Sequence, residues 1–178
     1  MRMRGHRAVV AALRAAAERE GAVVDIERTP PDLFVLQADG SVVEEAMDIV
    51  VYWPGAGTAH WLDVSIRCVH ASRYTAAQRR GGVAAAAGET EQRRRYGNSV
   101  SPVVFEASGR MGRGGIAEIT AMDHDARMYG KRKLGKSPGL NLGSLRVLLE
   151  AAVIRHDADA ALLSPGSLGT VALGWVPR

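Results

Sequence analysis

The sequence predicts an α/β fold in which helices flank a central mixed β-sheet. Two alternating β-type runs at 47–53 and 60–69, joined by a glycine-containing turn, indicate an antiparallel hairpin. A helical stretch at 72–96, followed by the apolar run 103–106, indicates a crossover to a parallel strand. Because one chain carries both kinds of pairing, the predicted sheet is mixed.

The chain before the hairpin is predicted to form one helix and two strands. Apolar residues recur at three- and four-residue spacing over 6–20, which is typical of an amphipathic helix, and Gly21 can end it. A strand is predicted at 23–27. After a pair of prolines, a short strand is predicted at 33–36, with its turn at 38–40.

The chain after the hairpin is predicted to contain two more helices. Gly81 and Gly82 interrupt the helical stretch, so the helix proper is predicted over 83–96. A last helix is predicted over 145–154, and its expected buried stripe is Leu145, Leu148, Leu149 and Ala152. Three segments have weaker patterns: a glycine-rich stretch at 109–115, an ambiguous one at 116–122 and a basic loop at 128–142.

Length and composition set the broad class. The 178 residues fit one compact domain, expected at 1–164 with a tail at 165–178, and 47% hydrophobic residues are too many for a chain disordered throughout. No run approaches the roughly 18 apolar residues of a membrane span, and no signal-peptide pattern is present, so an intracellular protein without a membrane partner is expected. The lone Cys68 cannot form an internal disulfide, which fits a reducing compartment.

The basic residues are clustered. Lys and Arg number 23 and Asp and Glu 19, so the net charge is 23 − 19 = +4. All the lysines fall between 131 and 136, and arginines gather near the N-terminus, at 79–80 and at 93–95. Clusters of this kind suit a polyanion such as nucleic acid, although a solvated charged face is the commoner meaning of a single run.

Two aspartates of the hairpin form the candidate chemical site. If the turn is centred at 55–56, cross-strand partners sum to 111, which places Asp48 opposite Asp63 with Cβ atoms about 5 Å apart. Like charges at that distance need neutralising, and two carboxylates suit Mg²⁺ or Mn²⁺. Alternatively, the register is off by one, or each aspartate pairs with a nearby arginine.

Side-chain alternation divides each strand of the hairpin into two faces. On the first strand it predicts that Asp48, Val50 and Tyr52 share one face, opposite Met47, Ile49 and Val51. On the second strand it places Asp63, Ser65 and Arg67 together on one face, opposite an apolar face.

The hairpin resembles a known nuclease family. The runs 47–51 and 61–66 are similar to the hydrophobic-Asp and Asp-Val-Thr-Val motifs of the restriction-like endonuclease domain of site-specific non-LTR retrotransposons, a branch of the PD-(D/E)XK nuclease superfamily. The segments 5–7, 84–96 and 103–112 resemble further parts of that domain. The resemblance covers roughly residues 5–112 and implies a PD-(D/E)XK restriction-endonuclease-like core. It also implies DNA cleavage by activated water at Mg²⁺ or Mn²⁺ held by Asp48 and Asp63. An intracellular, nuclear location is expected.

The resemblance also implies roles for residues near the two acids, with one departure. The superfamily places a lysine two residues after the second acid, where this chain has Ser65. In the retrotransposon branch the lysine lies on the following helix, where this chain has Gln92 or Arg93, and a Gln92/Tyr96 pair resembles that of other nucleases in the superfamily. Helical spacing is expected to place these residues and Glu89 on one face. Arginine can orient water or stabilise charge but cannot act as the base.

The remaining predicted contacts are with DNA. His6 on the first helix is expected to touch phosphate or, alternatively, to be an ordinary surface residue, and Arg67 is a second candidate contact. The basic loop supplies backbone contacts through Lys131, Arg132, Lys133 and Lys136. The sequence leaves two alternatives to a metal-dependent endonuclease: a catalytically inactive DNA-binding module with the same fold, and a Holliday-junction-type resolvase acting as a homodimer.

Overall fold

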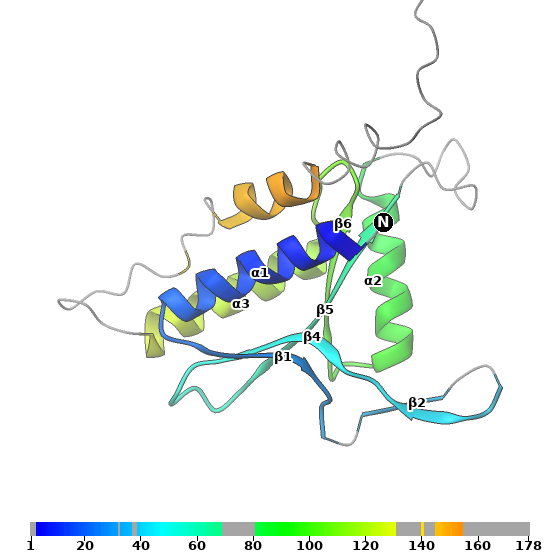
Figure 1. Cartoon of the computed structure of the whole chain (residues 1–178), viewed down its shortest axis with the longest axis horizontal. Helices are drawn as coiled ribbons and strands as arrows, with labels where there is room; N and C mark the ends of the chain where they lie inside the picture. The colour runs from blue at the N-terminus through cyan, green and yellow to red at the C-terminus, as the bar shows by residue number, and fades with distance from the viewer. Residues whose placement is uncertain are drawn as a thin grey trace, which may run out of the picture.

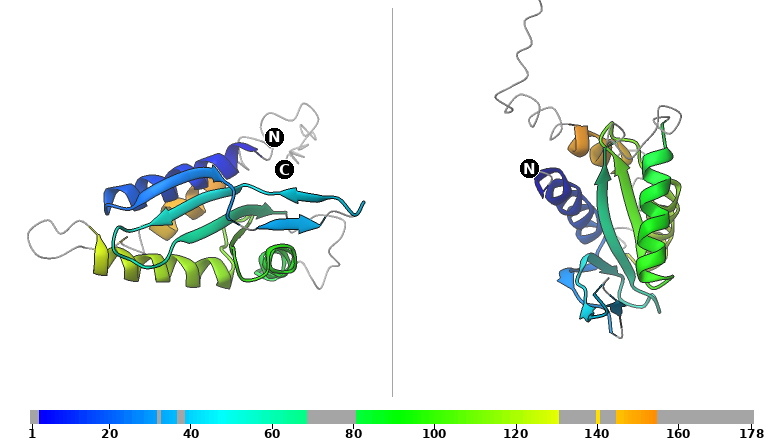
Figure 2. Two further views of the ribbon diagram at one scale, coloured as in Figure 1. Left: turned by 90° about the horizontal axis from the view of Figure 1, so that it is seen from below. Right: turned by 90° about the vertical axis from the view of Figure 1, so that its right-hand side faces the viewer.

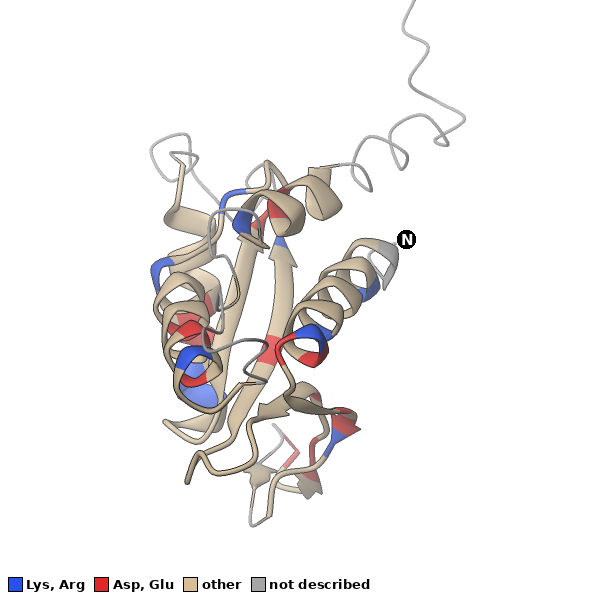
Figure 3. Cartoon of the chain, turned by 90° about the vertical axis from the view of Figure 1, so that its left-hand side faces the viewer, with Lys and Arg blue, Asp and Glu red and all other residues tan. Residues whose placement is uncertain are grey.

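The computed structural model describes residues 3–31, 33–36, 39–68, 81–130, 140 and 145–154. Its centre is a four-stranded sheet flanked by helices, with α1 and α2 on opposite faces (Figures 1 and 2). This confirms the predicted α/β class with a mixed central sheet. Charged residues of the described chain lie on the helices and also on strands of the sheet (Figure 3), including Asp25, Glu27 and Arg28 of the first strand.

The sheet has the strand order β1-β4-β5-β6. The strands are β1 (Val23–Arg28), β4 (Met47–Tyr52), β5 (His60–Arg67) and β6 (Ser101–Glu106). β4 is antiparallel to both β1 and β5, whereas β6 is parallel to β5. The pairs Ile49↔Leu62, Val50↔Trp61 and Val51↔His60 each sum to 111, so the predicted hairpin register is confirmed.

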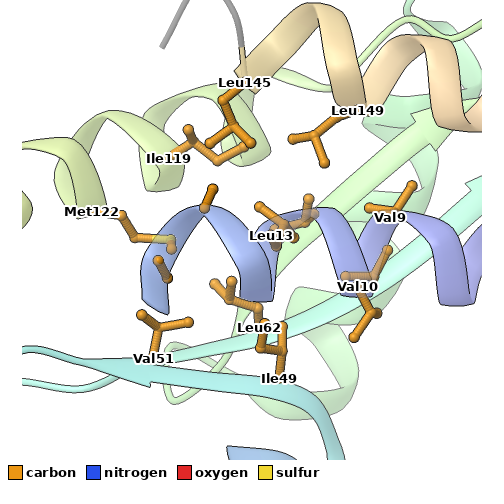
Figure 4. Packing of buried hydrophobic residues seen from close by; sticks show 14 of the residues in the cluster. Val9, Val10, Leu13, Ile49, Val51, Leu62, Ile119, Met122, Leu145 and Leu149 are labelled. Atoms are coloured by element: carbon orange, nitrogen blue, oxygen red, sulfur yellow. The ribbon is translucent and has the colours of Figure 1, made fainter. Parts of the chain in front are cut away.

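One apolar cluster joins the first helix, the sheet and the later helices. α1 (Met3–Arg19) contributes Val9, Leu13 and Ala17, and Gly21, with φ 88°, takes the left-handed conformation just beyond its end. These side chains pack on Ile49 and Leu62 of the sheet, with α3 and the 145–154 helix closing the cluster (Figure 4). The face of the sheet that carries the apolar residues of β5 is therefore the core face.

The helix 145–154 is present as predicted, but its buried stripe differs. Leu145, Leu149 and Val153 are buried at four-residue spacing, whereas Leu148 is 58% exposed. The prediction that Leu148 is buried is therefore wrong, because the helix packs along a single i, i+4 row. Ala152 is partly buried against the cluster.

α2 (Val83–Tyr96) is the predicted crossover helix between β5 and β6, with its predicted bounds confirmed. Its N-terminus is capped from the sheet: an Oε1 of Glu106 on β6 accepts hydrogen bonds from the backbone N–H groups of Gly82 (2.7 Å) and Ala84 (3.1 Å). Glu106 is only 1% exposed. A carboxylate at the positive end of a helix is stabilised there, which explains a buried acid on an apolar strand.

α3 (Arg113–Tyr129) is a long helix where the sequence predicted an ambiguous segment and, from residue 128, a loop. The glycines before it hid its start from the pattern. The structure shows that Gly109 turns the chain with φ 91° and that a Glu89 carboxylate oxygen accepts hydrogen bonds from the N–H groups of Gly114 (2.8 Å) and Gly115 (3.4 Å). An acid from α2 thus supplies the helix cap that the local sequence lacks.

A small two-stranded ribbon stands apart from the main sheet. β2 (Phe34–Leu36) pairs antiparallel with β3 (Val42–Glu44), in agreement with the predicted short strand and turn. At its base, Leu33 packs with Met47 and Val100 in a second apolar cluster, which Trp61 and Tyr96 flank. No helix in the described part of the chain is long and apolar enough to cross a membrane.

Candidate active site

The ladder between β4 and β5 ends one pair before the two aspartates. Its last pair is Ile49↔Leu62, and beyond it an Oδ2 of Asp48 accepts the backbone N–H of Val64 at 2.6 Å. On the other side of β4, Glu27 has φ 52°, so the backbone of β1 leaves the extended conformation at the level of Asp48. A side chain replaces a ladder bond here, which fixes the Asp48 carboxylate between the strands.

This local distortion changes the faces of β4. Met47 packs with the second apolar cluster beside Tyr96, and Asp48 is bonded to His6 of α1. The prediction that Met47 shares a face with Ile49, and Asp48 with Val50, is therefore wrong at this end of the strand. Regular alternation requires an unbroken ladder, and the ladder is broken at Asp48.

Asp63 lies on the opposite side of the sheet from α1, under α2. A Gln92 Nε2 donates a hydrogen bond to its Oδ2 at 2.5 Å, and Gln92 is only 6% exposed. Burial, the charge of Asp48 and a hydrogen bond between the two carboxyl groups raise the pKa of Asp63 to about 7. The expected meeting of the two acids is therefore found, although Asp48 reaches Asp63 from between the strands.

Tyr96 lies one helical turn beyond Gln92 and also contacts Asp63. Burial and the neighbouring Asp63 carboxylate, which also hydrogen-bonds the phenol, raise the pKa of Tyr96 to about 12. Tyr96 therefore stays a neutral hydrogen-bond donor at neutral pH. The structure brings the predicted Gln92/Tyr96 pair to the second acid.

His6 completes the cluster from α1. Its Nε2 lies 2.9 Å from Oδ2 of Asp48, and the side chains of His6 and Asp48 are 31% and 22% exposed. The hydrogen bond to Asp48 raises the pKa of His6, against the opposing effect of burial. His6, predicted as a DNA contact, thus sits at the solvent-accessible side of the acid pair.

Ser65 takes the position two residues after the second acid. Its hydroxyl oxygen is buried and has no hydrogen-bond partner among the described residues. α2 covers this part of β5, as the close approach of Gly88 to the side chains of Arg67 and Val104 shows. Ser65 supplies a neutral hydroxyl and no charge at the position where the resemblance implies a lysine.

Arg93 and Glu89 do not join the site. Arg93 is exposed, and its guanidinium lies against Gly114 near the Glu89 cap of α3. Glu89 and Arg93 form one i, i+4 row of α2, and Gln92 and Tyr96 form the adjacent row. Only the second row faces Asp63.

Arg67 lies on β5 beyond Ser65. Its Nη1 is 3.0 Å from a carboxylate oxygen of Glu91, and its side chain is only 17% exposed beneath α2. This position leaves little of Arg67 available for direct contact with DNA. The predicted contacts Lys131, Arg132, Lys133 and Lys136 lie outside the described residues.

Sequence reasoning missed a second polar cluster, at the other end of β5. His60 lies 2.6 Å through Nδ1 from Glu118 and 3.0 Å through Nε2 from Asp125, both on α3. Ser101 on β6 donates its hydroxyl to the second oxygen of Glu118 at 2.7 Å. The seven-residue spacing of Glu118 and Asp125 signals one helix face, but nothing local points to a histidine 58 and 65 residues earlier.

The acid pair is the part of the site that can hold a metal. Among the described residues, no group of three or more His, Cys, Asp or Glu side chains is arranged to bind an ion. Mg²⁺, however, is commonly held by one or two carboxylates together with water and substrate phosphate. The two contacting carboxyl groups, one with a raised pKa, form an excess of negative charge that fits such an ion.

The chain was compared with protein-family models, with curated proteins and with solved structures. None of the three comparisons gives a significant match.

Proposed function

We propose that the protein is a metal-dependent DNA endonuclease of retroelement origin, with a PD-(D/E)XK restriction-endonuclease-like core. The observation that supports this most is the contact between Asp48 and Asp63: burial and this contact together raise the pKa of Asp63 to about 7. Two carboxylates held in contact repel each other, which destabilises the folded protein unless a cation binds between them. The mixed sheet with helices on both faces is compatible with this fold.

Asp48 and Asp63 would hold Mg²⁺ or Mn²⁺. The bound ion would lower the pKa of a water molecule and offset charge on the phosphodiester during hydrolysis. The chain itself fixes the carboxylates: Val64 N–H and His6 hold Asp48, and Gln92 and Tyr96 hold Asp63. His6, partly exposed beside Asp48, is placed to donate a hydrogen bond to a phosphate oxygen.

Nicking of supercoiled plasmid tests the proposal. We expect nicking with Mg²⁺ or Mn²⁺, and a loss of at least about 100-fold in Asp48→Asn and Asp63→Asn, because carboxylate ligands are replaced by neutral amides. The matched control is Asp25→Asn on the neighbouring strand, where the acid pairs with Arg28 away from the site. Absence of nicking with either ion, with Asp63→Asn indistinguishable from wild type, would favour a non-catalytic DNA-binding module.

The basic loop is proposed to contact the DNA backbone. Replacing Lys131, Lys133 and Lys136 by Gln should weaken binding to any duplex and reduce the slope of log K against log [salt] by about 0.9 per lost phosphate contact. Fluorescence anisotropy at several salt concentrations measures both. An unchanged affinity and slope would exclude this loop from the interface.

A further inference from the structure

Three buried polar atoms beneath α2 have no hydrogen-bond partner among the described residues. They are Oγ of Ser65, Nε of Arg67 and Oε1 of Gln92. Ser65 and Arg67 are two residues apart on β5, on the face that carries Asp63, and Gln92 of α2 reaches this face at Asp63, two residues before Ser65. We call these three residues the polar seam. Buried polar groups in native proteins are almost always satisfied, so the seam requires a partner.

α2 packs closely against the sheet beside the polar seam. At Gly88 a Cβ atom would lie 3.1 Å from Nε of Arg67 and 2.8 Å from Val104, so α2 approaches the sheet closely there. Gln92 follows one turn later and reaches Asp63. The seam therefore runs along β5 from Arg67, past Ser65, to the amide that holds the second acid.

One small molecule that both donates and accepts hydrogen bonds could satisfy all three atoms of the polar seam. Arg67 Nε–H can only donate, Gln92 Oε1 can only accept, and the Ser65 hydroxyl can do either. A metal cation would suit the two oxygens but not the guanidinium beside them. A water molecule accepts from one partner, donates to another and has capacity for a third.

We propose that an ordered water molecule occupies the polar seam and joins Arg67 to Gln92, with Ser65 as its third partner. Arg67 donates to the water, and the water donates to Oε1 of Gln92. Glu91 holds the guanidinium from outside through Nη1, at 3.0 Å, which leaves Nε facing inward. The water site takes the place of the lysine that the resemblance implies at position 65.

This assigns Arg67 as a positioning residue for Asp63, an inference that rests on the proposed function. A hydrogen bond to the amide oxygen of Gln92 strengthens the donor character of its Nε2, which bonds Asp63. The positive charge of Arg67 thus acts on the acid through water and Gln92. The partners behind a metal-binding residue orient it, and their loss commonly weakens metal affinity 10- to 100-fold.

Mn²⁺ binding to the DNA-free protein, followed by electron paramagnetic resonance, tests this role. Arg67→Met keeps the apolar stem and should weaken Mn²⁺ binding about 10-fold, lower kcat for nicking and leave KM for DNA unchanged. Arg67→Lys should restore part of the loss. Ser65→Ala, a smaller change that leaves the fold intact, should weaken binding by less. The matched control Glu18→Gln removes the exposed partner of Arg14 on α1, away from the polar seam, and should leave Mn²⁺ affinity unchanged.

A high-resolution crystal structure tests the water directly. We expect density for a water within hydrogen-bond distance of Ser65, Arg67 and Gln92, which is lost in Gln92→Leu. A protein side chain in the seam, or wild-type Mn²⁺ affinity in Arg67→Met, would overturn the inference while leaving the nuclease proposal standing. Failure of the proposed function has a different signature: wild-type protein that neither binds Mn²⁺ at Asp48 and Asp63 nor nicks DNA.

Discussion

Two pairs of acids lie beside β5, and the pairs differ in what neutralises them. At the start of β5, Glu118 and Asp125 of α3 share His60, which bonds one acid through each ring nitrogen. At the middle of β5, Asp48 and Asp63 contact each other, and the one described histidine in contact, His6, reaches only Asp48. The first pair is complete without a ligand, whereas the second retains unbalanced negative charge.

The pKa shifts follow this difference. Burial alone would raise the pKa of Glu118, but the bonds from His60 and Ser101 and the charge of His60 outweigh it and lower that pKa. At Asp63, burial and the charge of Asp48 outweigh the hydrogen bond that Gln92 donates, and the pKa rises to about 7. A salt-bridged cluster of the first kind supports the fold, whereas repulsion of the second kind is typical of a functional site.

The largest stability effect is expected at the complete cluster. Glu118→Gln leaves the imidazolium of His60 with one charged partner in a largely buried position and should lower the free energy of unfolding by about 2 kcal/mol at pH 6. Urea denaturation measures it. The control Glu18→Gln removes an exposed i, i+4 partner of Arg14 and should change stability by less than about 0.5 kcal/mol. Equal effects of the two substitutions would contradict a structural role for the cluster.

Removing an acid from the Asp48 and Asp63 pair should raise the free energy of unfolding, the opposite of the effect at Glu118. Asp63 has a higher pKa when folded than when unfolded, so above pH 4 the folded state is progressively disfavoured, with the full penalty reached above pH 7. Asp63→Asn should therefore raise the free energy of unfolding of the metal-free protein at pH 8 by about 1–2 kcal/mol.

Thermal or urea unfolding at pH 4 and pH 8 measures whether Asp63→Asn raises or lowers the free energy of unfolding. The gain should disappear at pH 4, where Asp63 is protonated in the folded protein. Asp25→Asn, whose acid is paired with Arg28, is the matched control and should show no gain at pH 8. A loss of stability in Asp63→Asn at pH 8 would show that the acids are not in repulsive contact.

The pH dependence of His60 sharpens the comparison. Burial lowers the pKa of His60, but the hydrogen bonds and charges of Glu118 and Asp125 outweigh burial and raise the pKa above its usual value near 6.5. A raised pKa means that the stabilisation is complete below about pH 6.5 and is lost as pH rises through the folded-state pKa. The difference in the free energy of unfolding between wild type and His60→Gln should therefore shrink as the pH rises from 6 through the folded-state pKa of His60. A difference independent of pH would mean that His60 is neutral.

The features of the fold that depend on residues close together in the sequence could be predicted from the sequence. The hairpin register followed from one turn and the alternation of its strands, and α2 followed from its composition and the glycines before it. α3 was missed because its start lies among glycines and is stabilised by Glu89 from another helix. Intrinsic propensity is a weak guide where the cap comes from a distant segment.

The candidate site was predictable as residues but not as geometry. The sequence predicted that Asp48 and Asp63 meet, and it indicated Tyr96 together with Gln92 or Arg93 on the following helix. It did not predict that Asp48 replaces a ladder bond to Val64, since that depends on how the backbone of β1 and β4 departs from regular pairing. The partners of His60 were equally hidden, because the contacts that pair distant residues follow from the packing of α3 on the sheet.

The smallest effect on the free energy of unfolding is expected at His6. Comparing His6 with His60 therefore tests most directly whether the two histidines have different roles. His6 is 31% exposed and bonds one carboxylate, whereas His60 is 10% exposed and bonds two. His6→Gln should therefore change the free energy of unfolding by less than about 1 kcal/mol, against a clearly larger loss for His60→Gln at the same pH. Parallel urea denaturation at pH 6 measures both. If His6→Gln proves as costly as His60→Gln, the Asp48 and Asp63 pair is already neutralised by the fold, and its role as a cation site loses its physical basis.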